Sequence, residues 1–178
     1  MRILRLPPWI TRHLSAYCAA LMQRRPPDRA VCHTDGTRYL LRWYIHGGRG
    51  PDGAAGTGRA LYLHAFHGSD LGRLHDHPWG SVSLIVAGDC FEHLPADSGS
   101  PGGPTRAVRR RPGDVVVRRA RSPHRIELPA DASVPVVTLF AVGRRTRRWG
   151  FWCPQGWRDG RRFKEVARLH GDAGAGCE

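Results

Sequence analysis

The first regular pattern in the chain is a run of apolar residues at helical spacing between residues 9 and 24. The run contains Ile10, Leu14, Tyr17, Leu21 and Met22. Residues at these intervals lie near one face of a helix. Pro7 and Pro8 stand before the segment, and Pro26 and Pro27 follow it after Arg25; proline limits a helix at both ends. The pattern therefore predicts an N-terminal helix whose buried face covers the outside of a sheet.

Most of the remaining chain alternates between apolar and polar residues, which is typical of strands. Strands are expected at residues 38–46 and 59–67, within 72–88, and at 115–117, 125–128 and 134–142. In the second of these, Tyr62, His64 and Phe66 share one side. Loops rich in glycine and proline are expected at 47–59 and 95–104, because neither segment favours regular structure. This pattern predicts an all-β sandwich or barrel.

The C-terminal part of the chain looks different. Residues 149–157 read WGFWCPQGW and are interpreted as a core or lid strand. Residues 161–170 are expected to form a short helix, and 171–178 a frayed tail. With 178 residues, of which 40% are hydrophobic, the chain is long enough for one sizeable core. We expect a helical extension at 1–30, a β-barrel at 31–158, and a C-terminal helix with a flexible tail at 159–178.

Candidate chemistry concentrates in the segment GRLHDHPWGSVSLIVAG, residues 72–88. If this segment is extended, His75 and His77 point to one side and Asp76 to the other. Two imidazoles aimed together can bind one metal ion when a third ligand completes the site. His124, in RSPHRIEL, is the candidate for that third ligand. A pair of histidines on a solvated strand face is the alternative.

The spacing of these residues resembles the cupin family, over about residues 60–142. The family's first motif places a carboxylate a few residues after the second histidine, and a glycine further on. In this chain, Ser81 and Gly88 occupy these two positions. The second motif leads from a glycine to the third metal histidine, and Gly113 and His124 have that separation.

Together with the all-β pattern, the resemblance implies a double-stranded β-helix, or jelly-roll, barrel, and the predicted helices stand at its two ends. It also implies that His75, His77 and His124 bind one metal ion, while serine replaces the usual glutamate. A hydroxyl is a poor ligand, so open coordination positions are expected. The arrangement is similar to that of the thiol dioxygenases, in which three histidines hold Fe(II).

The function that this resemblance implies is oxidation of a small anionic metabolite, bearing a carboxylate or a thiol, by Fe(II) and O2. Ser81, Arg73 and His64 are the candidate catalytic residues, because Ser81 stands at the carboxylate position, Arg73 flanks a ligand and His64 can line the cavity. A cupin isomerase or lyase that uses zinc, nickel or manganese is one alternative. A non-catalytic small-molecule-binding cupin is the other.

Several further residues have more than one interpretation. Arg125 also flanks a proposed ligand and could bind a carboxylate. His67 could line the cavity or lie at the surface, and Glu92 and Glu127 could act as acids or be solvated. Trp79, together with Phe66, is expected to form a wall of the pocket.

The formal net charge of +13 raises the question of a nucleic-acid partner. Lys164 is the only lysine, and arginines are spread along the chain without a recognition motif. We therefore expect a basic rim that attracts small anionic substrates, with neither nucleic acid nor a membrane as partner. A homodimer is expected by analogy with the family.

The five cysteines show no metal-ligand spacing, and their odd number argues against a disulfide framework. We expect reduced thiols in a cytoplasmic protein. The N-terminus lacks the continuous apolar region of an export signal.

Overall fold

The computed structural model describes all residues except 1, 34, 50–54, 98–99, 171–173 and 178. Its helices are α1 (Pro8–Arg24), α2 (Gly160–His170) and the short 3-10 helix η1 (Gly174–Cys177). Its strands are β1 (Arg2–Arg5), β2 (Arg29–Cys32), β3 (Arg38–Arg49), β4 (Ala55–Phe66), β5 (Ser81–Ala87), β6 (Cys90–Pro95), β7 (Thr105–Arg110), β8 (Asp114–Arg118), β9 (Arg125–Glu127), β10 (Val136–Val142), β11 (Gly150–Cys153) and β12 (Gly156–Asp159).

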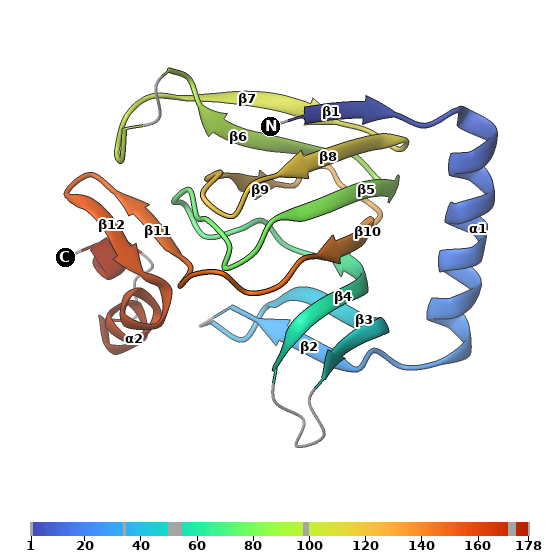
Figure 1. Ribbon diagram of the computed structural model, residues 1–178, viewed down its shortest axis with the longest axis horizontal. Coiled ribbons are helices and arrows are strands. Elements are labelled where there is room, and N and C mark those ends of the chain that lie inside the picture. Colours follow the sequence, from blue (N-terminus) through green and yellow to red (C-terminus); the bar gives the residue numbers. More distant parts are fainter. Residues whose placement is uncertain (1, 34, 50–54, 98–99, 171–173, 178) are drawn as a thin grey trace.

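The strands form a seven-stranded sheet, in the order β1-β8-β5-β10-β4-β3-β2, and a three-stranded sheet, in the order β7-β6-β9 (Figure 1). The strands β11 and β12 form a separate hairpin, rich in tryptophan. From β5 onward the chain passes repeatedly between the two sheets. The strands β5, β8 and β10 belong to the larger sheet, and β6, β7 and β9 to the smaller. An antiparallel ribbon wound in this way is a jelly roll, or double-stranded β-helix. The predicted all-β fold is confirmed.

Part of the core joins residues of both sheets. Ile85, Cys90 and Val136 are buried together, with Phe66, Ile126 and Leu128 packed against them. The larger sheet contributes residues of β4, β5 and β10 to this cluster. The smaller sheet contributes residues of β6 and β9, together with Leu128, which follows β9. Because both sheets contribute apolar side chains, this cluster fixes the distance between the sheets.

The helix α1 covers the outer face of the larger sheet, as its periodicity predicts. Cys18 is buried against Trp43, Leu63 and Val86, and other apolar residues of the helix pack around this cluster. Tyr17 differs from the prediction, because it is 62% exposed. The helix begins at Pro8, a position where the missing N–H of proline costs no hydrogen bond.

Several strands were not predicted, because they are short or glycine-rich. The strand β1 pairs with β8, and β2 pairs with β3. The segment expected to be only a helical extension therefore also adds two strands to the larger sheet. The hairpin of β3 and β4 also extends to Arg49 and Ala55, into the segment expected to be a loop. Backbone hydrogen bonds hold such strands without the side-chain pattern on which the prediction relied. The loop between them, 50–54, lies outside the described residues.

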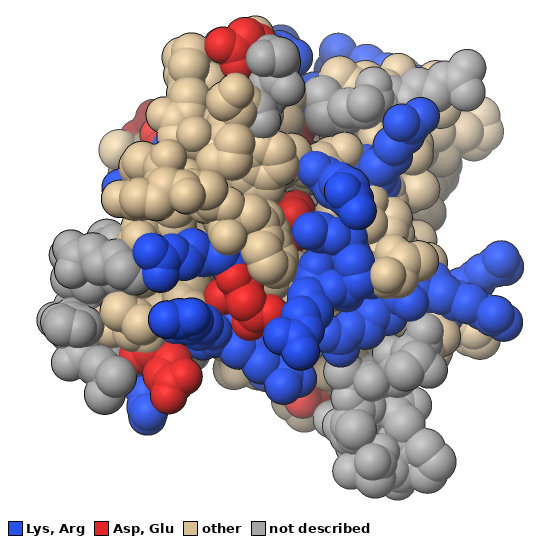
Figure 2. Space-filling view, turned by 60° about the vertical axis from the view of Figure 1, so that its left-hand side comes forward, with Lys and Arg blue, Asp and Glu red and all other residues tan. Residues whose placement is uncertain are grey.

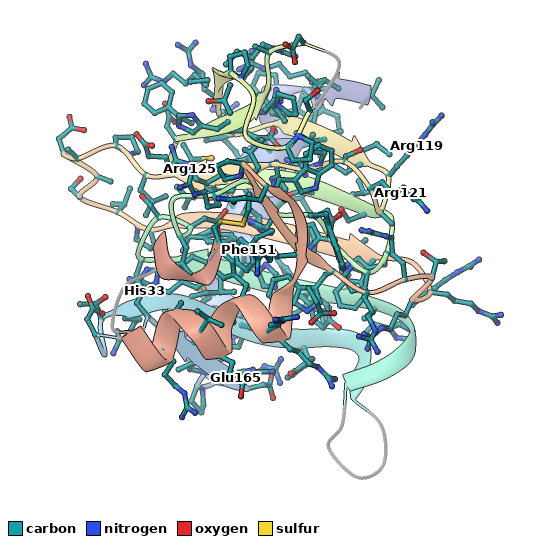
Figure 3. All side chains as sticks on the ribbon, turned by 90° about the vertical axis from the view of Figure 1, so that its left-hand side faces the viewer. His33, Arg119, Arg121, Arg125, Phe151 and Glu165 are labelled. Atoms are coloured by element: carbon teal, nitrogen blue, oxygen red, sulfur yellow. A yellow bond between two sulfur atoms is a disulfide. The ribbon has the colours of Figure 1, made fainter. Side chains whose placement is uncertain are left out.

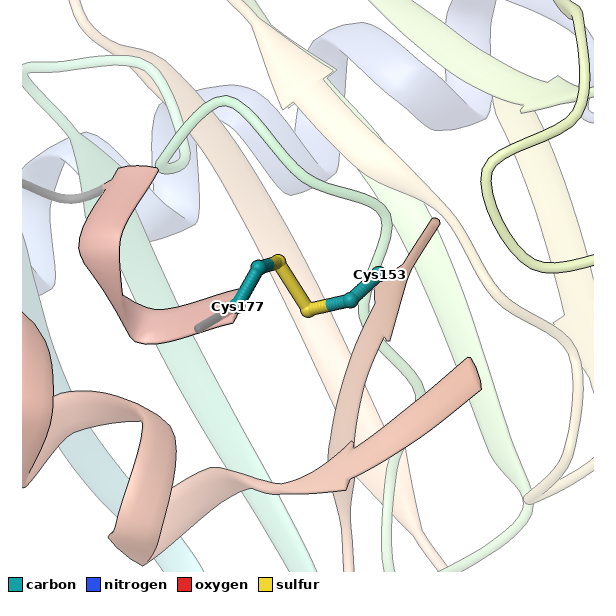
Figure 4. Close-up of a disulfide and its surroundings, with 2 residues drawn as sticks. All are labelled: Cys153 and Cys177. Atoms are coloured by element: carbon teal, nitrogen blue, oxygen red, sulfur yellow. A yellow bond between two sulfur atoms is a disulfide. The ribbon is translucent and has the colours of Figure 1, made fainter. Parts of the chain in front are cut away.

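The C-terminal segment corrects two expectations, since Cys153 at the end of β11 forms a disulfide with Cys177 in η1 (Figure 4). Cys177 is buried in a cluster with Phe151, Phe163 and Ala167. The expectation of reduced thiols was wrong for these two cysteines, and the expectation of a frayed tail was wrong for Gly174–Cys177. Because disulfides persist mainly in oxidising environments, the thiol argument for a cytoplasmic location is weakened. That location stays a prediction.

Replacing Cys153 and Cys177 together by serine is expected to lower the free energy of unfolding by roughly 3–4 kcal/mol. The disulfide joins residues 24 positions apart, and such a crosslink reduces the entropy of the unfolded chain. Urea unfolding of the oxidised protein measures the difference. The matched control is Cys32→Ser, which removes an exposed free thiol and should change stability by less than about 0.5 kcal/mol. A native protein with five titratable thiols would contradict this prediction.

Among the residues that the structure describes, no helix is both long enough and apolar enough to cross a membrane.

Candidate metal centre

Three histidines, His75, His77 and His124, come together at one end of the jelly roll. Each offers one ring nitrogen, and these atoms all lie within 4.8 Å of one another. His77 Nε2 lies 2.8 Å from His124 Nε2. The structure therefore brings together the three ligands that the sequence predicted.

The backbone around these histidines is held by an isolated bridge and not by a regular strand. The amide of His75 donates to the carbonyl of His124 at 2.9 Å, and the amide of His124 donates to the carbonyl of His75 at 2.9 Å. His75 also forms a bridge with Phe151 of β11. The predicted strand begins only at Ser81, because Pro78 lacks an N–H for a ladder. The two imidazoles still share a side, with ring centroids 5.1 Å apart.

Burial makes these imidazoles suitable metal ligands. It lowers the pKa of His75 to about 4, with a smaller contribution from His124. Burial, followed by the neighbouring His124 and His75, also lowers the pKa of His77 well below its usual value. Both rings are therefore neutral near pH 7, as metal binding requires. A divalent ion bonds imidazole nitrogen at about 2.0–2.1 Å, and the close approach of the donor atoms fits one such ion.

Glu92 of β6 supports His124 from behind. It is fully buried, and its Oε1 lies 3.1 Å from His124 Nδ1. Arg110 and Arg118 donate to its carboxylate, through Nε, at 2.7 and 2.8 Å. Burial alone would raise the pKa of Glu92, but the hydrogen bond with His124 and the charges of Arg118 and Arg110 lower it overall. The ionised carboxylate favours a proton on Nδ1 of His124, so that Nε2 is left to bind metal.

Two carboxylates, Asp70 and Asp76, lie close to the His75–His77 segment. Asp70 accepts hydrogen bonds from the Tyr39 hydroxyl and, at 2.6 Å, from the Ile126 amide, and it lies 4.0 Å from His75 Nδ1. Asp76 is buried and points away from the histidines, as predicted.

Asp76 instead joins the segment to the tryptophan-rich hairpin. It accepts from Arg147 Nη1 at 2.5 Å, the Gly150 amide at 2.8 Å and Trp157 Nε1 at 3.0 Å. Phe151 and Cys153 of the hairpin segment 149–157 are buried, as expected for a core strand, whereas Trp157 is 39% exposed. Through Asp76, the hairpin segment helps to position His75 and His77.

The histidines face a cavity of about 120 Å³ between the sheets. Phe66 and Trp79 line it, as predicted, and so does His64. Cys90 also lines it, but burial, followed by the charge of Glu92, raises the pKa of its thiol to about 12. The thiol is therefore neutral near pH 7.

The other candidate residues lie elsewhere. Ser81 is buried, but Ser83, two residues further along β5, is the serine that lines the cavity. Arg73 and Arg125 line a separate pocket of about 130 Å³, so neither lines the cavity that the three histidines face. Glu127 is 42% exposed and pairs with Arg125, and His67 lies at another surface pocket. The catalytic roles of Ser81, Arg73 and His64 stay predictions.

Arg42 of β3 is a cavity residue that the sequence analysis did not single out. It lies opposite His64 in the register of β3 and β4, and its Nε donates to His64 Nε2 at 2.8 Å. Its guanidinium carbon lies 4.8 Å from the centroid of the Tyr62 ring. In the described part of the chain, no carboxylate forms an ion pair with it within 4.0 Å. The alternation of β3 carried a signal, since Arg42 shares a face with Leu40, but only the strand register shows that this face lines the cavity.

Comparison with known proteins identifies relatives in structure but not in sequence. No protein-family model matches the chain, and no curated protein sequence does. A double-stranded β-helix protein of Klebsiella pneumoniae aligns with 64% of this chain and 84% of its own, at 11% identity and a TM-score of 0.44. A cupin-like protein of unknown function from Ralstonia eutropha aligns over 72% of this chain and 68% of its own, at 12% identity and a TM-score of 0.47.

Oxalate decarboxylase of Bacillus subtilis, studied for its Mn(II) centres, is another similar structure. It aligns with 72% of this chain, which spans 30% of the enzyme, at 16% identity and a TM-score of 0.46. These likenesses concern the fold only. The strand order of the chain is itself that of the double-stranded β-helix, the fold of the cupins, and three histidines in it can hold a metal ion.

Proposed function

We propose that this protein is a mononuclear metal-dependent enzyme that uses Fe(II) and O2 to oxidise a small anionic metabolite, bearing a carboxylate or a thiol. The observation that carries the proposal is the combination of the ligand set and the cavity. Three histidines converge without a carboxylate among the donors, and the same cavity contains the Arg42 guanidinium. The set leaves the charge of a divalent ion uncompensated, which favours an anionic ligand.

His75, His77 and His124 would hold the metal. Fe(II) held by so few protein ligands supplies open coordination positions and redox chemistry with dioxygen. Glu92 keeps the imidazole of His124 oriented, since a carboxylate behind a metal-ligating histidine fixes the tautomer and the ring direction.

Arg42 and His64 would position the substrate. His64 accepts the hydrogen bond from Arg42 on Nε2, so its own proton is on Nδ1. Burial, followed by the charge of Arg42, lowers the pKa of His64 well below its usual value, which keeps the ring neutral and able to accept. This contact uses Nε of Arg42, and the terminal amino groups can bind a carboxylate with two hydrogen bonds. The apolar rings of Phe66 and Phe140 line the same cavity and would exclude water from the site.

Charge outside the cavity also supports an anionic substrate. Figure 2 shows a band of Lys and Arg side chains across one face, with few acidic side chains among them. Arg145, Arg148 and Arg161 line one hollow at the surface, where Asp159 pairs with Arg148 and leaves an excess of positive charge. Such a surface raises the local concentration of anions, and salt would screen this attraction over about 10 Å at 0.1 M.

Anaerobic purification followed by metal analysis and ligand titration tests the proposal. With Fe(II) loaded, carboxylates, keto acids and thiols are screened by the spectrum of the nitric oxide adduct and by oxygen uptake. We expect at least one of these anions to change the spectrum and to stimulate oxygen uptake. Arg42→Met should weaken its binding about ten- to hundredfold, the loss typical of a charge-assisted hydrogen bond. Arg38→Met, which removes an exposed charge from the same strand, is the matched control and should bind like the wild type.

Other outcomes would support a different function. Tightly bound zinc, nickel or manganese without oxygen uptake would favour an isomerase, a lyase or a non-catalytic binding protein. Tight binding of an oligonucleotide, combined with no response to any carboxylate or thiol, would contradict the proposal.

A further inference from the structure

A second and larger pocket adjoins the metal cavity on the side of α2. Its volume is about 290 Å³. Tyr39, Asp70 and His75 line both this pocket and the metal cavity. Residues from β2, from β11 and from α2 form its other walls. Figure 3 labels His33 and Phe151, two of the residues that line this pocket.

The walls of this pocket are mainly apolar and aromatic. Leu71, Trp149 and Phe151 line it, and the rings of Trp149 and Phe151 have centroids 5.5 Å apart at an interplanar angle of 59°. Two aromatic rings inclined to each other in this way offer edge and face contacts to a third ring. The pocket can therefore accept the apolar body of a ligand.

Two cations, Lys164 and Arg168, also line the pocket. The ammonium group of Lys164 lies 5.2 Å from the centroid of the Trp149 ring. In the described part of the chain, neither cation forms an ion pair with a carboxylate within 4.0 Å. The acidic residue among the lining residues is Asp70, whose oxygens already accept hydrogen bonds from Tyr39 and from the Ile126 amide. The pocket thus combines an aromatic wall with positive charge that no carboxylate of the described residues neutralises at contact distance.

We propose that this pocket binds an aromatic carboxylic acid, with the ring against Trp149 and Phe151 and the carboxylate at Lys164. An aryl ring gains apolar burial and ring contacts, and a carboxylate gains a charge-assisted hydrogen bond with the ammonium group. A neutral amide of the same shape keeps the apolar burial and the ring contacts, but it loses the charge-assisted hydrogen bond. The site is distinct from the position at Arg42, because Arg42 does not line this pocket.

Cys32 provides a direct measure of occupancy. Its thiol is exposed and lines this pocket, whereas the other free cysteines, Cys18 and Cys90, are buried. Alkylation of the full-length protein by iodoacetamide, followed by peptide mass spectrometry, therefore reports whether a ligand covers Cys32. Quenching of tryptophan fluorescence gives the affinity independently.

The probe is 3-phenylpropionate, and 3-phenylpropanamide is its neutral control. We expect the acid to slow alkylation of Cys32 and to bind about ten- to hundredfold more tightly than the amide. Lys164→Met should abolish that preference. Arg162→Met removes one exposed charge from the same helix, at a residue outside the lining of the pocket, and should leave it unchanged. Lys164 is exposed, so the variant is expected to fold, and thermal melting checks this.

Arg42→Met separates this site from the metal cavity, since the pocket should still bind the acid in that variant. Equal binding of acid and amide, wild-type affinity in Lys164→Met, or loss of binding in Arg42→Met alone would each overturn the proposal. All these measurements can be made without loading metal, so a failure of the metal centre would not be mistaken for a failure of this pocket.

Discussion

Replacing His75, His77 or His124 by alanine is expected to remove nearly all bound metal and to lower the melting temperature of the metal-loaded protein. Each imidazole supplies one of three donor atoms within 4.8 Å, and two donors alone leave the ion mostly hydrated. A metal that binds only the folded state stabilises it by about 2.7 kcal/mol when present at a hundred times its dissociation constant. The variants should lose that contribution.

Metal analysis and thermal melting, each with and without a chelator, measure both effects. The chelator should lower the melting temperature of the wild type and leave the three variants unchanged. His67→Ala is the matched control, because His67 lines a different, surface pocket, and it should retain metal. Equal metal content in the wild type and all three variants would disprove the site.

Replacing Glu92 by glutamine is expected to destabilise the protein by about 3–5 kcal/mol. The carboxylate is fully buried and contacts Arg110, Arg118 and His124. Glutamine keeps the shape but removes the negative charge, so the buried guanidinium of Arg118 loses its counter-charge. Breaking one partner of a buried ion pair has this cost because the remaining charge cannot be hydrated. Urea unfolding of the metal-free protein measures the loss.

The same variant should also bind metal about 10- to 100-fold more weakly, since the group that orients His124 is changed. Glu127→Gln is the matched control. Glu127 pairs with Arg125 on β9 and is 42% exposed, and exposed pairs contribute about 0–1 kcal/mol. Similar losses of stability in the two variants would show that the burial of Glu92 has no special role.

The local pattern of the sequence was sufficient for most of the elements and for the grouping of the three histidines. Alternation along β4 places His64 and Phe66 on the cavity side, because successive side chains of a strand point to opposite faces. The same rule puts His75 and His77 on one side and Asp76 on the other. The separation of Gly113 and His124, which matches the family's second motif, pointed to His124 as the third histidine. The strand that the sequence predicted around His75 is only an isolated bridge.

The residues that support and surround this centre depended on contacts between distant segments. Arg42 reaches His64 through the pairing of β3 with β4, and Glu92 reaches His124 through the pairing of β6 with β9. The period of a strand reveals which residues share a face, but not which strand lies beside it or in what register.

The sequence by itself thus determined the all-β class, the helix that covers the sheet and the three histidines. Each of these follows from the periodicity or spacing of nearby residues, or from the family resemblance. The tertiary structure alone decided that Glu92 is a buried partner of His124 and that Arg42, not Arg73, lines the cavity. It also decided that Cys153 and Cys177 pair, since their spacing of 24 positions carries no signal until α2 folds back and brings the two sulfur atoms together.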